Sequence, residues 1–574
     1  MQYTGARILV EALIEQGVDT VFGYPGGAVL FIYDELYKQK DRIRHILVSH
    51  EQHAAHAADG YARSTGKVGV CIATSGPGAT NLVTGIATAA MDSSPLVAIT
   101  GNVGTALLGK DSFQEVDIAG ITMPIVKHNW IVKEVGELAE IVREAFLVAA
   151  SGRPGPVLID IPKDITACLG PWIPQVKTQG IPDGTRRARA LRLTQRIEEA
   201  TFTDADIAQA VAMLTQAKRP VIYAGGGVIL SGASEELRRL AEQLHAPVAV
   251  SLMGVGAIPF DHPLYTGLLG MHGTVASNRA VQQGDLLVAI GARFSERVTS
   301  CSDTFAPDAR ILHLDIDPAE INKNIKVEAW VVGDIQKILT QVLDRLPLMP
   351  ETAWKQDIET WKTLVPQANK PDAGSKDLHP RFIIEKTAQA LGRDALVVTD
   401  VGQHQMWTAQ FYPITQARSF ISSGGLGTMG FGLGAAAGAK IANPDKPVVL
   451  FTGDGSFRMN CGELATLVAY QIPVLILILN NRVLGMVRQW QTLFYEGRYA
   501  ETILDRPPDF VKLAEAYGIA GYRAEDAEVF TEVLGNAVQE LRTGKPVLID
   551  ARIPCDEKVL PMVPGGKPLD EQLW

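Results

Sequence analysis

Short apolar runs alternate with amphipathic stretches along almost the whole chain. The clearest runs lie at 69–73, 96–100, 157–161, 221–224, 286–290, 448–451 and 547–551, and helical spacing of apolar positions separates them. Strands buried on both faces read as continuous apolar runs, and their alternation with helices is typical of parallel sheets. The pattern therefore predicts an α/β protein built from doubly wound parallel sheets.

Two stretches interrupt this alternation. One, at 168–203, has scattered Pro and Gly and a basic run at 186–196; the other, at 346–380, is rich in Pro, Lys and Trp. We expect both to be linkers that contain some helix, which leaves domains at 1–167, 204–345 and 381–553 and a C-terminal tail at 554–574. A chain of 574 residues also exceeds what one hydrophobic core accommodates. The basic run is interpreted as solvated linker, with an anion-binding patch as the alternative.

The first and third domains contain a similar order of motifs. A strand at 68–74 leads into Gly76-Pro77-Gly78, a helix, and a strand that ends at Gly101-Asn102. A strand at 448–452 leads into Gly453-Asp454-Gly455, a helix, and a strand that ends at Asn480-Asn481. The similarity predicts one fold used twice, with a chance likeness of two βαβ units as the alternative. Only the second copy has an acidic residue in its glycine turn.

Composition narrows the class of partner. The net charge of −10 opposes binding to nucleic acids or anionic membranes, so an anionic substrate requires local cations. The five cysteines are scattered without a C-x-x-C pair, which indicates free thiols in a reducing compartment. We recognise no signal or transit peptide, and the most apolar run, 472–479, is too short to cross a bilayer. We therefore expect a cytoplasmic protein.

The turn Gly453-Asp454-Gly455-Ser456 follows a predicted strand and opens a helix. Glycines let the backbone approach a phosphate, and a helix N-terminus offers free N–H groups. Asp454 would repel a phosphate directly, but it fits if a divalent cation lies between them. Asn481 ends the next strand and emerges at the same sheet edge. These hard oxygen ligands suit Mg²⁺, and G-D-G followed by N-N is the signature of thiamine-diphosphate enzymes.

Nearly the whole chain resembles the catalytic large subunits of the acetohydroxyacid synthase (acetolactate synthase) family. The matching stretches are 22–28, 50–63, 74–81, 113–115, 153–164, 270–274, 291–297, 401–407, 423–432, 480–495 and 562–564. The resemblance implies a pyrimidine-binding domain, a middle domain that binds flavin adenine dinucleotide (FAD), and a domain that binds diphosphate and Mg²⁺. It also implies decarboxylation of pyruvate and transfer of the remaining fragment to a second pyruvate or to 2-ketobutyrate. The products, 2-acetolactate and 2-aceto-2-hydroxybutyrate, serve branched-chain amino-acid biosynthesis.

The resemblance implies roles for individual residues around thiamine diphosphate. Glu51 would exchange a proton with N1′ of the aminopyrimidine, while the Gly427 carbonyl and Met429 hold that ring in a bent cofactor. The diphosphate and metal would be bound by Gly402, Gln403, His404, Gly453, Asp454, Gly455 and Ser456, with Asp454, Asn481 and the main-chain carbonyl of Val483 as metal ligands. The histidines near Glu51 lack zinc-site spacing and are expected in packing or a domain contact.

The family also implies substrate and flavin positions. Arg297 would bind the carboxylate of the second keto acid, and Trp490 would favour a longer alkyl group on it. The same pocket would be lined by Gly27, Phe113, Gln114, Lys163 and Met486. FAD would contact Gly225, Gly226, Gly227, Leu252, Met271, His272, Gly273, Gly291, Ala292, Arg293, Asp315, Ile316 and Asp334. The flavin would have a structural role without redox chemistry.

The expected partners are small 2-keto acids and a second copy of the chain, in a homodimer or homotetramer, with a small regulatory subunit as a further candidate. Glu51 and Asp454 lie in different copies of the repeat, and the superfamily builds its sites from two chains, so we expect shared active sites. The alternatives are an oxidase of the pyruvate-oxidase kind, a catabolic acetolactate synthase, and an inactive cofactor-binding paralogue. Trp490 and Arg297 argue against the oxidase.

Overall fold

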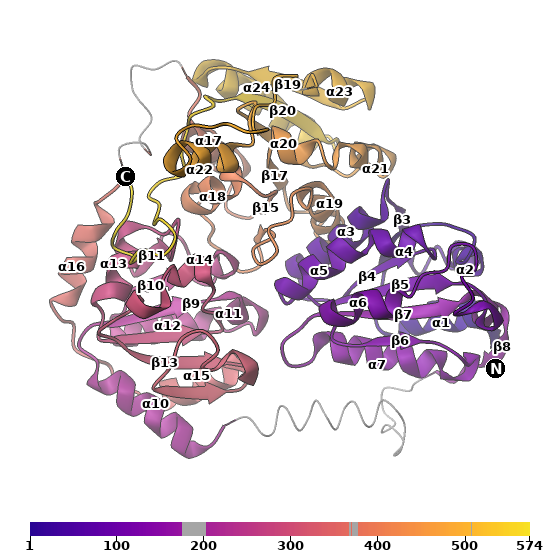
Figure 1. Cartoon of the computed structure of the whole chain (residues 1–574), viewed down its shortest axis with the longest axis horizontal. Coiled ribbons are helices and arrows are strands. Elements are labelled where there is room, and N and C mark those ends of the chain that lie inside the picture. Colours follow the sequence, from indigo (N-terminus) through magenta and orange to yellow (C-terminus); the bar gives the residue numbers. More distant parts are fainter. Residues whose placement is uncertain (175–201, 367–368, 370–376, 507) are drawn as a thin grey trace.

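The computed structural model describes residues 1–174, 202–366, 369, 377–506 and 508–574. Three units follow one another along the chain, each built around a six-stranded sheet. Figure 1 shows the first unit on the right, the middle unit on the left and the C-terminal unit at the top. All strand pairs within these three sheets are parallel, which confirms the predicted α/β class with doubly wound sheets.

The first sheet has the strand order β3-β2-β4-β5-β7-β6. Its strands are β2 (Thr20–Tyr24), β3 (Arg44–Leu47), β4 (Gly69–Ala73), β5 (Leu96–Asn102), β6 (Asn129–Ile131) and β7 (Pro156–Pro162). The helices of this unit are α1 (Gly5–Glu15), α2 (Leu30–Lys38), α3 (Glu51–Thr65), α4 (Pro77–Asn81), α5 (Val83–Met91), α6 (Ile118–Thr122), α7 (Leu138–Ala150) and α8 (Lys163–Ala167). The antiparallel pair β1 (Gln2–Thr4) and β8 (Leu169–Pro171) joins its two ends, so chain beyond 167 still packs on this unit.

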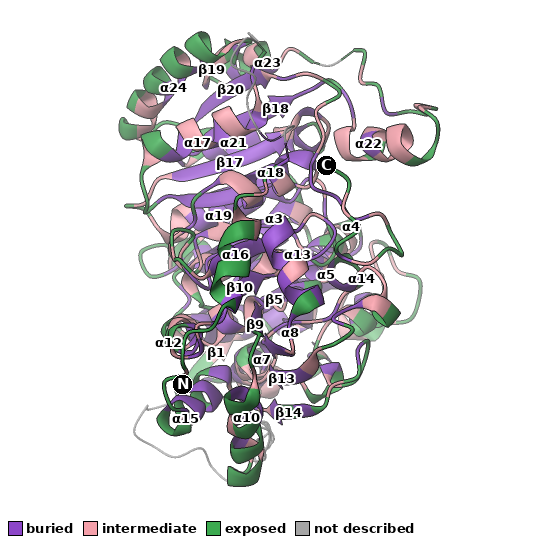
Figure 2. Cartoon of the chain, turned by 90° about the vertical axis from the view of Figure 1, so that its left-hand side faces the viewer, coloured by how far each residue is buried: buried purple, intermediate pink, exposed green. Residues whose placement is uncertain are grey.

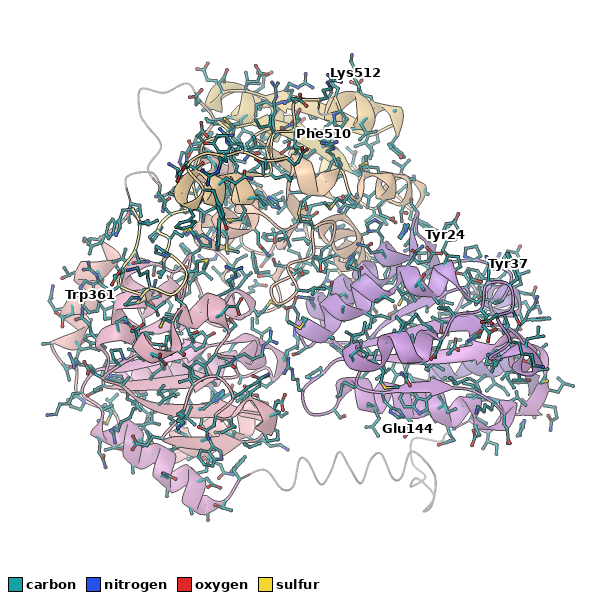
Figure 3. All side chains as sticks on the ribbon, viewed as in Figure 1. Tyr24, Tyr37, Glu144, Trp361, Phe510 and Lys512 are labelled. Carbon is teal, nitrogen blue, oxygen red and sulfur yellow. The ribbon has the colours of Figure 1, made fainter. Side chains whose placement is uncertain are left out.

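The middle sheet has the order β11-β10-β9-β12-β13-β14. Its strands are β9 (Pro220–Ala224), β10 (Val248–Val250), β11 (Tyr265–Leu268), β12 (Leu286–Ile290), β13 (Arg310–Asp315) and β14 (Ala329–Val332). Its helices are α10 (Asp204–Gln216), α11 (Gly226–Leu230), α12 (Ser234–Leu244), α13 (Val275–Gln283), α14 (Glu296–Thr299), α15 (Ile335–Arg345) and α16 (Trp354–Lys362). Helix α16 lies inside the predicted second linker, yet Trp354 packs into the middle-domain core, and Trp361 follows at the outer edge (Figure 3).

The C-terminal sheet has the order β16-β15-β17-β18-β20-β19. Its strands are β15 (Leu396–Thr399), β16 (Phe420–Ile421), β17 (Val448–Gly453), β18 (Leu475–Asn480), β19 (Ala520–Ala524) and β20 (Val547–Arg552). Its helices are α17 (Pro380–Leu391), α18 (Gln403–Phe411), α19 (Gly432–Ala442), α20 (Asp454–Phe457), α21 (Leu464–Ala469), α22 (Gly485–Phe494), α23 (Phe510–Ala516) and α24 (Ala527–Arg542). Replacing β2 to β7 by β15 to β20 converts the first strand order into this one, which confirms one fold used twice.

Helices α3 and α19 pack against each other and join the first and C-terminal units, in the buried centre of Figure 2. A Cβ on Gly60 would overlap the carbonyl of Ala435, so glycine permits the close approach. His56 lies at this contact, with its ring centroid 5.2 Å from that of Phe431. Burial lowers the pKa of His53 and His56 to about 3. The interpretation of the histidines near Glu51 as residues of packing or of a domain contact is confirmed for His53 and His56, which adjoin Gly434 of α19.

The remaining sequence predictions concern the termini and the cysteines. The C-terminal tail packs on the middle unit, where Val563 N donates to Met271 O at 2.8 Å and Leu569 is buried. All five cysteines lie within the described residues as free thiols. In the described ranges, no helix combines the length and the apolar character that a membrane crossing requires. The basic run at 186–196 lies outside the described residues.

Candidate active site

The carboxyl edge of the C-terminal sheet collects the residues predicted to bind the diphosphate. Strands β15, β17 and β18 are parallel neighbours and are followed by Gln403, Asp454 and Asn481. Their ends therefore meet at one edge of the sheet. Asn481 Nδ2 donates to Gln403 Oε1 at 3.2 Å, and a Cβ on Gly453 would lie 2.9 Å from His404 Nδ1. The structure thus brings this predicted set together.

The carboxyl of Asp454 is buried and only partly hydrogen-bonded. It is 1% exposed, and its Oδ2 has no hydrogen-bond partner among the residues that the structure describes. Burial raises the pKa of its carboxyl to about 7, because desolvation disfavours the charged form. Nearby, Val483 N donates to Asn481 Oδ1 at 3.2 Å, which places the third predicted metal ligand beside the second. These oxygens fit a hard divalent cation.

The protein alone does not complete such a site. The described residues contain no group of three or more His, Cys, Asp or Glu side chains suited to a metal. One carboxylate, one amide oxygen and one carbonyl leave several positions of an octahedral ion open. Mg²⁺ commonly fills such positions with phosphate oxygens and water. The donor set therefore fits a cation that binds together with a diphosphate.

The segment 422–430 between β16 and α19, which we call the pyrimidine loop, carries Gly427 and Met429. Gly427 is exposed and has φ +68°, a conformation that favours glycine. Met429 Cε lies 4.0 Å from the position of a Cβ on Gly455, so the loop reaches the diphosphate turn. Gly430 N donates to Ser456 Oγ at 3.3 Å. The loop and the G-D-G turn therefore form one continuous surface, as the family resemblance implies.

Asp400 supports this surface, although sequence reasoning gave it no role. It is fully buried directly after β15, and its Oδ1 accepts from Gly430 N at 2.8 Å. Its Oδ2 accepts from Asn460 Nδ2 at 3.2 Å. The sequence did contain a signal for Asp400, namely a carboxylate immediately after a buried parallel strand. The carboxyl edge, where such strands end, is where parallel sheets bind ligands.

Glu51 is the first residue of α3, at the carboxyl edge of the first sheet. It is 9% exposed, and a carboxylate at a helix N-terminus is favoured by the helix dipole. Asn81 Nδ2 donates to Glu51 Oε2 at 2.9 Å. Glu51 Oε1 lies 3.2 Å from the position of a Cβ on Gly78, so the glycine turn of the first copy adjoins the carboxylate. Sequence reasoning missed the contact of Asn81, although Asn81 ends a matching motif.

Arg297 and Trp490 lie together, from the middle and C-terminal units respectively. The guanidinium carbon of Arg297 lies 5.7 Å from the ring centroid of Trp490, within cation–π range. The Arg297 side chain is 62% exposed, and its Nε is 3.5 Å from Glu296 Oε1. Trp490 packs on an apolar cluster that contains Met271. A solvent-facing cation beside a flat apolar ring can bind a carboxylate and an alkyl group at once.

The other predicted pocket residues lie on different units. Gly27 and Lys163 are exposed on the first unit, as is Phe113, whose relative exposure is 88%. Gln114 is there too, with a positive φ of 59°. Met486 is partly buried on α22 of the C-terminal unit. In the single chain, the pocket residues are therefore divided between the unit on the right of Figure 1 and the units on the left and at the top.

The predicted flavin positions gather at the carboxyl edge of the middle sheet. Gly225, Gly291 and Asp315 stand at or directly after the ends of the adjacent strands β9, β12 and β13. A Cβ on Gly227 would lie 2.6 Å from Gly291 Cα, so these glycines already pack against each other. Leu252 follows β10, Met271, His272 and Gly273 follow β11, and Asp334 follows β14, all in the same sheet. Gly226, Ala292, Arg293 and Ile316 adjoin the residues named above.

Among the flavin positions, the side chains of Asp334 and Arg293 already have hydrogen-bond partners in the protein. Asp334 caps α15 by accepting from Lys337 N at 3.0 Å. Arg293 Nη2 donates to Met91 O at 2.8 Å, which ties the middle unit to the first. His272 is half-buried, and its Nδ1 is buried without a hydrogen-bond partner among the described residues. The edge therefore fits a dinucleotide by topology, since the crevice outside the carboxyl ends of such strands is the usual binding position.

Three family models match the three units in order. Residues 3–121 match the thiamine pyrophosphate enzyme N-terminal TPP binding domain, and residues 207–342 match the central domain of these enzymes. Residues 400–551 match their C-terminal TPP binding domain. The matches place thiamine-diphosphate binding in the two units that share one strand order.

Curated relatives resemble the chain over nearly its full length. An acetolactate synthase large subunit of Parasynechococcus marenigrum is 49% identical, over 98% of this chain and 90% of the relative. The acetolactate synthase isozyme 3 large subunit of Escherichia coli is 45% identical, over 100% and 98%. The acetolactate synthase large subunit of Corynebacterium glutamicum is 48% identical, over 98% and 89%. The chain belongs to the acetolactate synthase large-subunit family of thiamine-diphosphate enzymes.

Proposed function

We propose that this chain is the catalytic subunit of an acetolactate synthase. It decarboxylates pyruvate and joins the remaining two-carbon fragment to a second pyruvate or to 2-ketobutyrate, in branched-chain amino-acid biosynthesis. The observation that carries the proposal is the pairing of Arg297 with Trp490. The cation suits the carboxylate of a second keto acid, and the ring suits its alkyl group, so the pair fits an acceptor substrate that a simple decarboxylase does not need.

When bound, thiamine diphosphate would supply a carbon nucleophile and an acceptor for the electron pair that is left when carbon dioxide departs. Glu51 would hold and move the proton at N1′ of the aminopyrimidine, and Asn81 fixes one oxygen of that carboxylate. The Gly427 carbonyl would orient the exocyclic amino group, and Met429 would set the bend of the cofactor. Arg297 would orient the acceptor keto acid, with Trp490 against its alkyl group.

We also propose the two further cofactors. Mg²⁺ would be held by Asp454, Asn481 and the Val483 carbonyl. The buried Oδ2 of Asp454, which accepts no hydrogen bond within the described part of the chain, supports this assignment. FAD would occupy the carboxyl edge of the middle sheet, supported by the alignment of Gly225, Gly291 and Asp315 at three strand ends. In this reaction the flavin would have a structural role.

The assembly is part of the proposal. Glu51 belongs to the first copy of the repeated fold and Asp454 to the second, so a homodimer with two shared sites would complete each site from two chains. The division of the pocket residues between units of one chain supports this arrangement. Because the relatives named above are called large subunits, we propose that a small regulatory subunit also binds.

Product analysis tests the function. The purified chain receives thiamine diphosphate, Mg²⁺, FAD, pyruvate and 2-ketobutyrate, and we expect both acetohydroxy acids with release of carbon dioxide. Acetate or acetyl phosphate together with bleaching of the flavin would instead indicate an oxidase of the pyruvate-oxidase kind. Binding of thiamine diphosphate without release of carbon dioxide would indicate an inactive paralogue.

Mixing of subunits tests the shared site. Glu51→Gln and Asp454→Ala chains are each expected to be nearly inactive, but a mixed dimer would contain one intact site. Co-expression should recover about half of the wild-type activity per heterodimer, from two-fold symmetry. Proven heterodimers without activity would place each complete site within one chain.

A further inference from the structure

The pyrimidine loop is held from outside by the first unit of the same chain. Three side chains of that unit reach it, namely Arg63 on α3, Thr88 on α5 and Asp92 directly after α5. None of them has a part in the chemistry described above. We propose that these three are positioning residues that hold the loop in the conformation that binds the aminopyrimidine; this role rests on the proposed function.

Asp92 grips the backbone of the loop at two points. Its Oδ2 accepts from Gly424 N at 3.0 Å and its Oδ1 accepts from Gly425 N at 2.6 Å. Both donors precede Gly427 by no more than three residues, and the Asp92 side chain is fully buried. Hydrogen bonds from backbone N–H groups to a carboxylate are charge-assisted and short. Two of them on adjacent peptides fix both the position and the orientation of this part of the loop.

Arg63 neutralises the buried carboxylate of Asp92 and adds a third contact to the pyrimidine loop. Its Nη1 donates to Asp92 Oδ2 at 3.0 Å and to Ser422 O at 2.7 Å. Its Nε and Nη2 donate to the two oxygens of Asp59, each at 2.7 Å. Buried charges require such pairing, because an unpaired carboxylate in the interior is strongly destabilising. One guanidinium therefore links α3 to the carboxylate and to the start of the loop.

Thr88 holds the loop on the other side of Gly427. The hydroxyls of Thr88 and Thr428 are hydrogen-bonded at 2.7 Å, and both residues are buried. Within the loop, Ser423 Oγ accepts from Thr428 N at 3.0 Å. This hydrogen bond joins the two parts of the loop that the first unit holds. Gly427 is exposed between these anchors. The arrangement keeps one peptide accessible while its neighbours on both sides are fixed, as a preorganised binding loop requires.

Two variants test the proposal through binding of thiamine diphosphate with Mg²⁺, measured by calorimetry on the cofactor-free full chain. Asp92→Asn removes the charge and at least one acceptor, and should raise the dissociation constant roughly tenfold or more, as loss of a charge-assisted hydrogen bond implies. Thr88→Val keeps the side-chain shape and should raise it roughly three- to tenfold, as for a neutral hydrogen bond. For both, exchange of the cofactor C2 proton at saturation should also slow.

Glu15→Gln is the matched control. Arg143 donates to Glu15 through Nε at 2.7 Å and Nη2 at 2.8 Å, in the same unit but away from the loop. This variant should lower the thermal midpoint of the cofactor-free protein as Asp92→Asn does, but leave the dissociation constant unchanged. If Asp92→Asn does not fold, Thr88→Val decides. Binding within twofold of wild type in the variants that fold would overturn the proposal.

The wild-type protein separates this result from the proposed function. A wild-type chain that binds thiamine diphosphate but makes no acetolactate would overturn the proposed function. The comparison of cofactor binding among the variants would still decide whether Arg63, Thr88 and Asp92 position the loop. If the wild-type chain makes acetolactate, but Asp92→Asn and Thr88→Val bind thiamine diphosphate as tightly as wild type, the proposed function holds. The positioning role of Arg63, Thr88 and Asp92 is then refuted.

Discussion

Asn81 donates its side-chain amide to Glu51 at 2.9 Å, from the helix that follows the glycine turn of the first unit. The carboxylate that we expect to serve the cofactor is therefore oriented by its own unit before any cofactor binds. Asn81 belongs to a matching motif but had no assigned role, and this contact gives it an orienting role that can be measured.

Asn81→Ala should slow exchange of the cofactor C2 proton about tenfold, because loss of one hydrogen bond to a charged group leaves Glu51 less well oriented. Exchange is followed by nuclear magnetic resonance after transfer into deuterium oxide. Thr80→Ala, on the same helix, loses only a bond to Pro77 O and serves as the control. Equal rates in both variants would remove the orienting role.

Glu51→Gln should slow the same exchange by roughly 10²–10⁴, the range for loss of acid–base catalysis. The amide keeps the shape of the side chain but cannot exchange a proton with N1′. Cofactor affinity should change little by comparison. Exchange at the wild-type rate in this variant would refute the assignment of Glu51.

Asp454→Ala should abolish binding of Mg²⁺ and thiamine diphosphate together, since no cluster of three acidic or histidine side chains in the described chain can replace it. The cofactor-free protein should remain folded, because the change removes a carboxyl whose burial is itself unfavourable and whose Oδ2 has no hydrogen-bond partner among the described residues. Calorimetry and inhibition by chelators provide the readouts. Tight cofactor binding with Mg²⁺ present would show that another residue holds the metal.

Trp490→Leu should shift the product ratio toward 2-acetolactate by about tenfold or more, since one methylene in an apolar pocket is worth about 1–3 kcal/mol of discrimination. Competition between pyruvate and 2-ketobutyrate measures the ratio. Trp330→Leu, an exposed tryptophan on β14, is the control. An unaltered ratio would assign the selection of substrate to another residue.

Glu463 should make stability depend on pH. Burial raises the pKa of its carboxyl to about 7, so between its ordinary value and 7 the folded chain keeps a proton that the unfolded chain releases. This contribution to stability is present at low pH and is lost as the pH rises through 7. Glu463→Gln cannot ionise, so its thermal midpoint relative to wild type should increase from about pH 5 to pH 8.

The control for this pH series is Glu496→Gln, whose side chain is largely exposed beside Arg498. The difference between its thermal midpoint and that of wild type should stay constant across the same pH values. The comparison also bears on the site, because Glu463 accepts from Ser49 N at 3.1 Å, two residues before Glu51. If the difference in thermal midpoint between Glu463→Gln and wild type does not change with pH, the raised pKa of the Glu463 carboxyl is contradicted.

Much of the fold could be predicted because buried parallel strands are continuous apolar runs. The runs at 69–73, 286–290 and 448–451 lie within β4, β12 and β17. Elements inside the predicted linkers were harder to recognise, since Pro and Lys there surround the buried Trp172 and Trp354.

The shared position of candidate site residues could be predicted where they follow neighbouring strands, as Gln403, Asp454 and Asn481 do. It could not be predicted where contacts join distant segments: Asp92 and Gly424 are 332 positions apart. No periodicity or strand-end rule connects such a pair. Their contact depends on the packing of α3 against α19, which is a property of the assembled units.

The position of Asp92 has a genetic consequence. Asp92 shares a unit with Glu51, yet it holds the loop that lies beside Asp454 of its own chain. If active sites are shared between chains, a damaged Asp92 impairs the site to which its own Asp454 contributes, whereas a damaged Glu51 impairs the other. Alleles of Asp92 should therefore complement alleles of Glu51 and fail to complement those of Asp454. The boundary between complementation groups would thus run through the first unit, between two residues that share one core.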